Sequence, residues 1–270
     1  MPSSPAADAA ADRFAEPRSG RLTAWGNALL AGFAPPDNAA VAILGRDEAH
    51  RVSGLPGDAE GELHSLAWAL GRLRVLGVTG LRLALPSAGH PLGLTGPAGF
   101  NGEALAAGEA VLCVGAPLGF VPEVERYGPA GDQGVRVRWR GAVVGEGPGA
   151  DVASLDEAER SMADALREAT LLLTKLDVAG AGPDALRALD ALRRHGQDEL
   201  LAPGYSGRAV RVLGSARQVA ALLGIALEEH GAAVSAGEMA ARREVLAPLL
   251  RTARRAQVAA YNSLVDERPR

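Results

Sequence analysis

The chain has 270 residues, of which 47% are hydrophobic and 22% are charged. This content is enough to bury a sizeable core, and it excludes a chain that is disordered throughout. The formal net charge is -4, whereas proteins that bind nucleic acid or anionic membranes carry a basic surface. We therefore expect neither a nucleic-acid partner nor a membrane.

The N-terminal residues and the cysteine content indicate a cytoplasmic protein. Residues 1–19 carry three acidic side chains and no apolar segment, so we expect no signal peptide, and their Ala, Pro and Ser content predicts a disordered tail. No run approaches the roughly 18 apolar residues that a membrane span needs. The single Cys113 lies in an apolar run, which predicts a buried structural thiol in a reducing compartment.

Residues 20–147 are predicted to form an α/β domain that opens with helices. Apolar spacings of three and four mark three helical segments, which are residues 20–34, 37–44 and 63–73. Asp37 is expected to cap the second of them, and Gly45 to terminate it. The first is stopped by the prolines at 35 and 36.

The pattern then changes to the period of two that is typical of strands. Residues 81–85 and 110–114 are predicted strands, and Asn101 is expected to cap a helix that ends at Gly108 between them. Together they predict a βαβ unit with parallel strands. A Pro-Leu-Gly sequence follows each strand, so we expect the two exits, beginning at Pro91 and at Pro117, to lie side by side.

Residues 120–126 and 135–144 are predicted to form a hairpin with a turn rich in glycine. Val135, Val137 and Trp139 share one face of the second strand, and the other face carries the arginines at 136, 138 and 140. The register that places Glu125 opposite Arg136 also places Glu123 opposite Arg138, which predicts a charge-paired, solvated face. Anion binding by this face is the alternative.

Residues 151–266 are predicted to form a helical domain behind a glycine-rich boundary at residues 145–150. Ser154 with Glu157 and Ser235 with Glu238 form capping boxes, and Ser206 is expected to cap a further helix. With a helix from residue 183 to residue 195, four antiparallel helices are expected. Pro248 should kink or split the last one. The predicted class is α+β, with a small mixed sheet and helices followed by an antiparallel helical bundle.

The common catalytic and cofactor signatures are missing. A P-loop needs a lysine after its glycines, but the only lysine is Lys175, in a helix. Gly145, Gly147 and Gly149 lack the βαβ context of a dinucleotide fingerprint, and Ser206 lies outside any Gly-x-Ser-x-Gly elbow. Zinc motifs of the His-Glu-x-x-His or cysteine-rich type do not occur. We expect no cofactor and no metal.

The segment with the most site-like composition is residues 86–101, PSAGHPLGLTGPAGFN. It leaves the end of a predicted strand, where open α/β sheets bind ligands. His90 and Asn101 are the candidate catalytic residues, with His90 as acid or base, and Ser87 and Thr95 are candidate binding residues. The alternative is a tight connection that needs glycine and proline for its turns.

A second candidate surface lies on the last predicted helix. Four of its arginines fall within an arc of about 120° at 100° per residue, and they are Arg243, Arg251, Arg254 and Arg255. They could contact phosphates or an acidic partner. Because almost all basic residues of this chain are arginine, the alternative is a solvated helix face.

Two stretches resemble a known family. They are TAWGNALLAGFAPPDNAAVAILGRDEAH at residues 23–50 and LGRLRVLGVTGLRLALPSAGHPLGL at residues 70–94. They are similar to an uncharacterised family of proteins from high-GC Gram-positive bacteria. The resemblance implies a cytoplasmic location and assigns no activity.

The sequence therefore favours a binding protein over an enzyme. We expect a regulatory or scaffolding protein with a protein partner or a homo-oligomer, because every common catalytic signature is missing. The alternative is an enzyme or a binding protein for a small metabolite that uses residues 86–101. A pocket that brings His90 and Asn101 together would favour the alternative.

Overall fold

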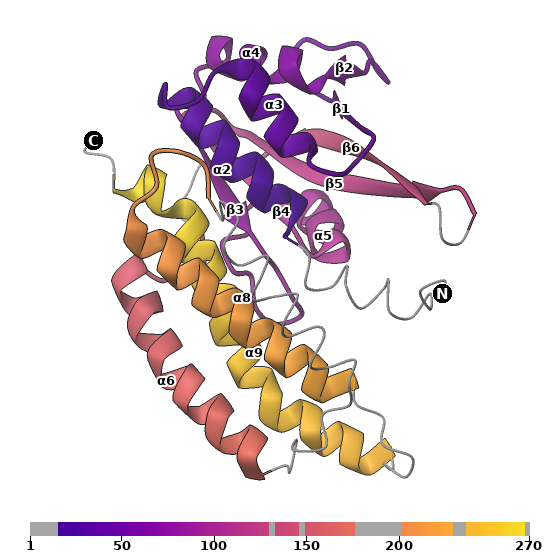
Figure 1. Cartoon of the computed structure of the whole chain (residues 1–270). Helices are drawn as coiled ribbons and strands as arrows, with labels where there is room; N and C mark the ends of the chain where they lie inside the picture. Colours follow the sequence, from indigo (N-terminus) through magenta and orange to yellow (C-terminus); the bar gives the residue numbers. More distant parts are fainter. Residues whose placement is uncertain (1–15, 130–132, 146–148, 176–200, 229–235, 268–270) are drawn as a thin grey trace. The chain divides into compact units, whose positions relative to one another are not determined.

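The computed structural model describes residues 16–129, 133–145, 149–175, 201–228 and 236–267 (Figure 1). They divide into two compact units. The first unit contains the chain up to Val152 together with Leu201–Tyr205 and the residues from Tyr261 onward. The second contains Ala153–Leu200 and Ser206–Ala260. The predicted domain limits, 20–147 and 151–266, stay predictions.

A mixed sheet of six strands forms the centre of the first unit. The strands are β1 (Ala49–Ser53), β2 (His64–Ser65), β3 (Gly80–Ala84), β4 (Ala110–Val114), β5 (Leu118–Tyr127) and β6 (Gly134–Val143). Their order is β2-β1-β6-β5-β4-β3, and only the β1–β6 pair is parallel. This sheet confirms the predicted mixed sheet and the α+β class.

Helices cover both faces of the sheet (Figure 1). In the part of this unit that the structure describes, the helices are α2 (Arg18–Leu30), α3 (Pro36–Leu44), α4 (Leu66–Val75) and α5 (Ala98–Ala107). The larger core cluster contains Leu22 of α2, Ile43 of α3 and Leu70 of α4 with Trp139 of β6. The smaller cluster places Phe100 of α5 against the other face. Burial of these apolar side chains is the main stabilising contribution.

The β5–β6 hairpin has the predicted register. Glu123 lies opposite Arg138 and Glu125 opposite Arg136, while Val137 and Trp139 are buried on the other face. Arg138 Nε donates to Glu123 at 2.7 Å. The predicted charge-paired face is confirmed, although the ion pair of Arg136 is with Glu48.

Helices α2, α3 and α4 begin at positions that differ from the predicted ones. Helix α2 begins at Arg18, two residues inside the predicted tail. Helix α3 has Pro36 at its first position, so Asp37 lies in the first turn and is not the cap. Helix α4 begins at Leu66 and not at residue 63, because the Ser65 hydroxyl accepts a hydrogen bond from the Trp68 N–H (3.3 Å).

The predicted βαβ unit is wrong. Strands β3 and β4 are neighbours, but they pair antiparallel, with Leu81 opposite Cys113. Their exits therefore lie at opposite ends of the pair, and the segment after Pro117 continues directly into β5. Asn101 is also not a cap, because α5 begins after Pro97 and Asn101 lies within it; the predicted end at Gly108 is confirmed. Hydrophobic patterns fix the strands but not their relative direction.

Two asparagine side chains cover the outer edge of β3. Asn27 of α2 donates to the Leu81 carbonyl (2.8 Å) and accepts from the Leu81 N–H (2.7 Å). Asn262, close to the end of α9 (Ala236–Asp266), makes the same pair with Leu83 at 3.1 and 2.7 Å. The two amides replace a further strand, so this edge presents fewer unpaired backbone groups.

Among the described residues of the second unit, the helices are α6 (Leu155–Lys175), α8 (Gly207–Glu228) and the part of α9 up to Ala260. The Ser154–Glu157 capping box is confirmed, and Ser206 Oγ accepts from the Ala209 N–H (3.3 Å). Pro248 does not split α9. The helix predicted at residues 183–195 and the cap at Ser235 lie outside the described residues, and the antiparallel bundle stays a prediction. None of the helices described has the length and apolar character that a bilayer span requires.

Candidate functional site

The loop between β3 and α5 is held by its own backbone. The Leu85 N–H donates to the Leu92 carbonyl (3.1 Å), and Ser87 and His90 exchange two backbone hydrogen bonds of 2.9 and 2.8 Å. Gly89 closes this turn with a φ of 77°, a conformation that glycine adopts without steric penalty. The loop is therefore a defined structure that can form the wall of a site.

The second half of this loop is strained. Leu92 has a φ of 42°, which is unfavourable for a bulky side chain, and Gly93 follows with 93°. Leu92 is only 1% exposed, so the burial of its side chain offsets the backbone strain. At Gly93 a Cβ would lie 3.0 Å from the Leu83 carbonyl oxygen, which explains the glycine. This strained conformation fixes the position of the pocket wall that follows.

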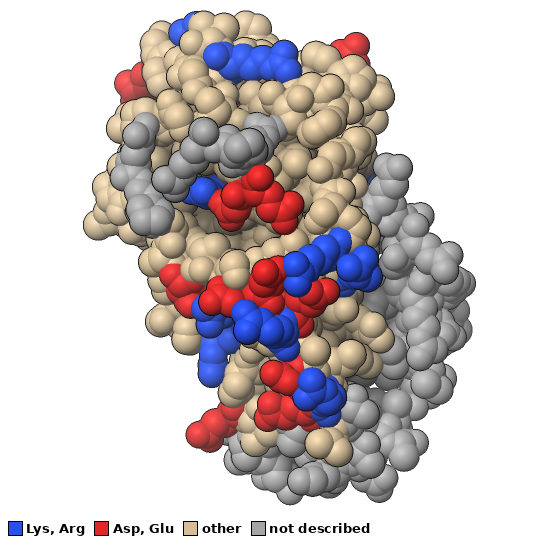
Figure 2. Space-filling model, turned by 90° about the vertical axis from the view of Figure 1, so that its left-hand side faces the viewer, with Lys and Arg blue, Asp and Glu red and all other residues tan. Residues whose placement is uncertain are grey.

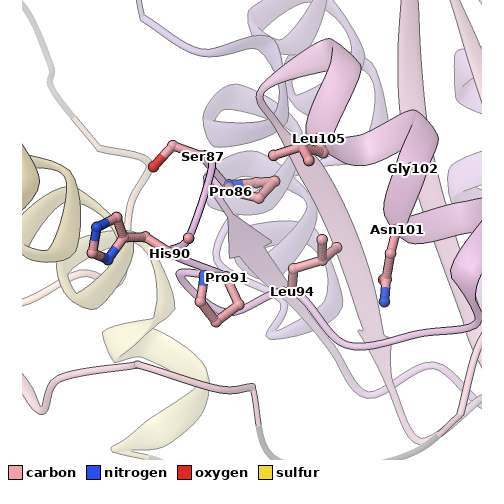
Figure 3. Close-up of a pocket in the computed structure, with 9 residues that line it drawn as sticks. Pro86, Ser87, His90, Pro91, Leu94, Asn101, Gly102 and Leu105 are labelled. Atoms are coloured by element: carbon pink, nitrogen blue, oxygen red, sulfur yellow. The ribbon is translucent and has the colours of Figure 1, made fainter.

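A pocket of about 330 Å³ lies between this loop and α5 (Figure 3). Its lining consists of Pro86, Ser87, Gly89, His90, Pro91, Leu94, Asn101, Gly102 and Leu105. Proline, leucine and glycine make up most of the wall. Leu105 is 47% exposed at the rim, so an apolar surface is open to solvent here.

Both predicted catalytic residues, His90 and Asn101, line this pocket, but their side chains do not point toward each other (Figure 3). The His90 ring and the Ser87 hydroxyl point to the side of the loop away from α5, whereas Asn101 extends from α5 (Figure 3). Thr95 is half-buried and does not line the pocket. A general base must lie within hydrogen-bond reach of the reacting group, and this arrangement does not focus the two side chains on one point.

Asn101 has a structural task instead. Its Nδ2 donates to the Gly96 carbonyl at 2.8 Å, which ties the end of the loop to the first turn of α5. Its Oδ1 is buried and makes no hydrogen bond. Asn101 thus fixes the pocket wall, and its polar atoms are turned to the protein rather than to the opening.

A smaller pocket of about 290 Å³ lies on the same unit and is more polar. Arg18, Glu109 and Arg126 contribute its charged groups. The Ser19 N–H donates to Glu109 Oε2 at 2.7 Å, so this carboxylate caps the start of α2. Burial raises the pKa of Glu109, against the hydrogen bonds from Ser19. The carboxylate of this pocket thus already has a structural partner in the first turn of α2.

The arginines of the last helix do not share one solvated face. Arg251 and Arg254 are half-buried, whereas Arg255 is exposed, and the side chain of Arg243 lies outside the described residues. The second unit also carries paired charges. Arg208 of α8 forms an ion pair with Glu159 of α6 at 2.6 Å. Figure 2 shows one face of the molecule, where basic and acidic surfaces are interleaved. On the face shown, the interleaved charges differ from the continuous basic surface that binds phosphates.

A buried charge network, which sequence reasoning missed, connects α2, β1 and β6. The Asp47 carboxylate accepts hydrogen bonds from Arg18 (2.8 and 2.9 Å) and Arg21 (2.6 Å), and lies 3.1 Å from His50 Nε2. Trp139 Nε1 donates to His50 Nδ1 at 3.3 Å, so the imidazole proton lies on Nε2 and is donated to Asp47. Both nitrogens of the His50 ring and the Asp47 carboxylate are paired, whereas Arg21 Nε has no hydrogen-bond partner.

Burial alone would disfavour the charged form of Asp47. The hydrogen bonds from His50 and Arg18 and the charges of Arg18 and Arg21 outweigh it, and hold the pKa of Asp47 well below its usual range. The pKa of the Cys113 thiol is shifted upward instead. Burial raises it to about 12. An unreactive, structural Cys113 is therefore what the structure supports.

A second cluster that the sequence did not predict contains Asp58, Glu62 and His64. The structure places one ligand-type atom of each within 4.8 Å of the others. Their spacing in the chain, Asp-x-x-x-Glu-x-His, matches no standard metal motif, so only the fold of the loop brings them together. The sequence motifs considered above did not single out this group.

The fold and the pocket define a class: an α+β protein with a mixed, helix-covered sheet and a further helical unit. Residues 19–152 match the model of the Rv1486c-like protein, N-terminal domain, and residues 156–258 match the model of the C-terminal domain. The chain therefore belongs to the Rv1486c-like family.

Two relatives support this assignment. The Uncharacterized protein MT1533 and the Uncharacterized protein Rv1486c, from two strains of Mycobacterium tuberculosis, are each 30% identical to the chain over 243 residues. The match covers 76% of this chain and 81% of each relative. No solved structure matches the chain. The predicted membership of an uncharacterised family of high-GC bacteria is confirmed.

Proposed function

We propose that the chain is a protein-binding protein with a regulatory or scaffolding role, and that the pocket between the β3–α5 loop and α5 holds an apolar side chain of its partner. The observation that carries this proposal is the character of the pocket wall. Pro86, Pro91, Leu94 and Leu105 provide apolar surface, and such surface favours a buried anchor side chain at a protein interface.

The orientation of the polar groups supports binding rather than catalysis. His90 and Ser87 point away from the α5 side of the pocket, and the amide of Asn101 is used inside the protein. An enzyme pocket would present a few convergent polar groups to a substrate. A binding pocket for an apolar side chain needs only shape and a dry wall.

The rigidity of the wall also supports a binding role. The Ser87–His90 turn, the Asn101–Gly96 bond and the strained Leu92 fix the loop before any partner arrives. A preorganised wall loses little conformational entropy on binding, so more of the contact energy appears as affinity.

The test places a photo-crosslinking amino acid at position 105 of the full chain in its own host, with position 106 as the matched control. Both positions are exposed on α5, but only Leu105 lines the pocket. We expect one defined crosslinked protein from position 105 and none from 106. A second pair of chains carries the crosslinker at position 102, one with Leu105 and one with Leu105→Glu. The substitution should lower the yield of the crosslinked product at least about tenfold, because it removes the anchor contact.

Equal products from both positions, or no product from position 105, would contradict the proposal. A small molecule that prevents crosslinking at position 105 would instead favour the metabolite-binding alternative.

A further inference from the structure

The loop between β1 and β2 arranges two carboxylates by the same device. The Leu55 N–H donates to Asp58 Oδ2 at 2.9 Å, and the Ala59 N–H donates to Glu62 Oε2 at 3.0 Å. In each case the backbone donor lies three residues before the acidic residue, so a local turn holds the carboxylate. One oxygen of each carboxylate is thus fixed, and the other is directed elsewhere.

The remaining oxygens converge on one imidazole nitrogen. Asp58 Oδ1 lies 3.0 Å and Glu62 Oε1 lies 3.8 Å from His64 Nε2. This nitrogen is buried and has no partner with hydrogen-bond geometry, in spite of the nearby carboxylates. An unpaired buried nitrogen is unfavourable, and here it faces two oxygens that also lack backbone donors.

The His64 ring is held in place from two sides. It is stacked on Trp68 of α4, with ring centroids 3.8 Å apart and planes inclined by 14°. The backbone of His64 pairs with Val52 of β1. The side chain of His64 is 12% exposed and that of Asp58 is 7% exposed, whereas Glu62 is 48% exposed. The group therefore has a fixed, buried side and one side open to solvent.

We propose that Asp58, Glu62 and His64 form a binding site for one divalent transition-metal ion of the Zn²⁺ type. Bonds of about 2.1 Å to a tetrahedral ion place ligand atoms about 3.4 Å apart. The distances of 3.0 and 3.8 Å in the cluster lie on either side of this value. A small movement of the exposed Glu62 would bring all three atoms into the coordination shell.

The chemistry of the donors selects the ion. One imidazole nitrogen with two carboxylate oxygens suits Zn²⁺ and its first-row neighbours. Ca²⁺ requires six to eight oxygen ligands and Mg²⁺ an octahedral oxygen shell, so this group suits neither. A dication also balances the negative charges of both carboxylates. The fourth position would face the solvent beside Glu62.

The test is a calorimetric zinc titration of the full, chelator-treated chain, read together with the fluorescence of Trp68. We expect one zinc ion per chain and a change in fluorescence, since the ion would bind the ring that Trp68 covers. The variant Trp68→Phe should keep the binding and lose most of the optical change. Magnesium should produce neither signal.

Two variants and one control assign the site. His64→Phe keeps a ring against Trp68 without a ligand atom, and Asp58→Asn keeps the shape of the carboxylate without its charge. Each should weaken zinc binding at least about 100-fold, since even loss of a supporting outer-shell group weakens a site by 10–100-fold. His90→Gln removes a histidine elsewhere and should leave binding unchanged. An unmodified chain without a zinc signal, or zinc binding that survives in Asp58→Asn, would overturn the proposal.

Discussion

The two Asp–His pairs of the first unit have almost the same distance but different surroundings. Asp47 lies 3.1 Å from His50 Nε2, and Asp58 lies 3.0 Å from His64 Nε2. Around Asp47, two arginines supply further donors, and Trp139 pairs with the second imidazole nitrogen. Beside the Asp58–His64 pair, a second carboxylate oxygen, Glu62 Oε1, lies 3.8 Å from the same imidazole nitrogen.

This difference separates a structural network from a group that has room for a ligand. In the Asp47 network two guanidinium groups and an imidazole surround one carboxylate, and an indole N–H pairs with the imidazole, so its contribution is to hold α2 against β1 and β6. The Asp58 cluster has two negative groups and one imidazole, and its buried nitrogen is unpaired. A close Asp–His contact alone does not indicate function; the state of the surrounding donors does.

The largest effect is expected from Asp47→Ala. It leaves Arg18 and Arg21, which are 16% and 15% exposed, without their counter-charge. Removal of one partner from a mostly buried pair destabilises by about 3 kcal/mol or more. Urea unfolding measures this change. Glu48→Ala is the control, because its pair with Arg136 is exposed and should contribute at most about 1 kcal/mol.

The pH dependence of this effect has a defined sign. The folded-state pKa of Asp47 lies below its unfolded value, so its stabilising contribution is present above about pH 4 and is lost as the pH falls toward the folded-state pKa. The stability difference between the unmodified chain and Asp47→Ala should therefore shrink from pH 5 to pH 2. A difference that grows with acid would contradict the account of this network.

A smaller effect is expected from Asp58→Asn without metal. The change removes one of two neighbouring negative charges and keeps the backbone hydrogen bond from Leu55, so the free energy of unfolding should change by less than about 1 kcal/mol. Thermal unfolding in excess zinc sharpens the comparison. Zinc should raise the Tm of the unmodified chain but not that of the variant, since a ligand stabilises only the state that it binds.

Local patterns predicted one region well and another poorly. For the β5–β6 hairpin, the alternation of Val137 and Trp139 with arginines and the opposed Glu123 sufficed to predict strands, faces and register. For β3 and β4 the strands were found, but their direction depends on how the long connection through α5 returns, which no local pattern encodes. The site prediction at residues 86–101 depended partly on that parallel arrangement.

The sites show the same limit. The composition of residues 86–101 indicated a candidate ligand loop, but the direction in which His90 points was not predictable, because it is set by the Ser87–His90 turn. The Asp47 network was missed because Arg18 was assigned to the tail. The grouping of Asp58 with His64 depends on the fold of the β1–β2 loop. An unusual density of acidic residues before a histidine, at residues 58–64, is the signal that could have indicated it.

Native mass spectrometry of the protein purified gently from its own host tests the proposed function most directly. It should be run on the unmodified chain and on Leu105→Glu in parallel. The proposal predicts a complex with a partner chain that is retained by the unmodified protein and lost in the variant. A small molecule bound to the chain in place of a partner, or the same species in both samples, would contradict it.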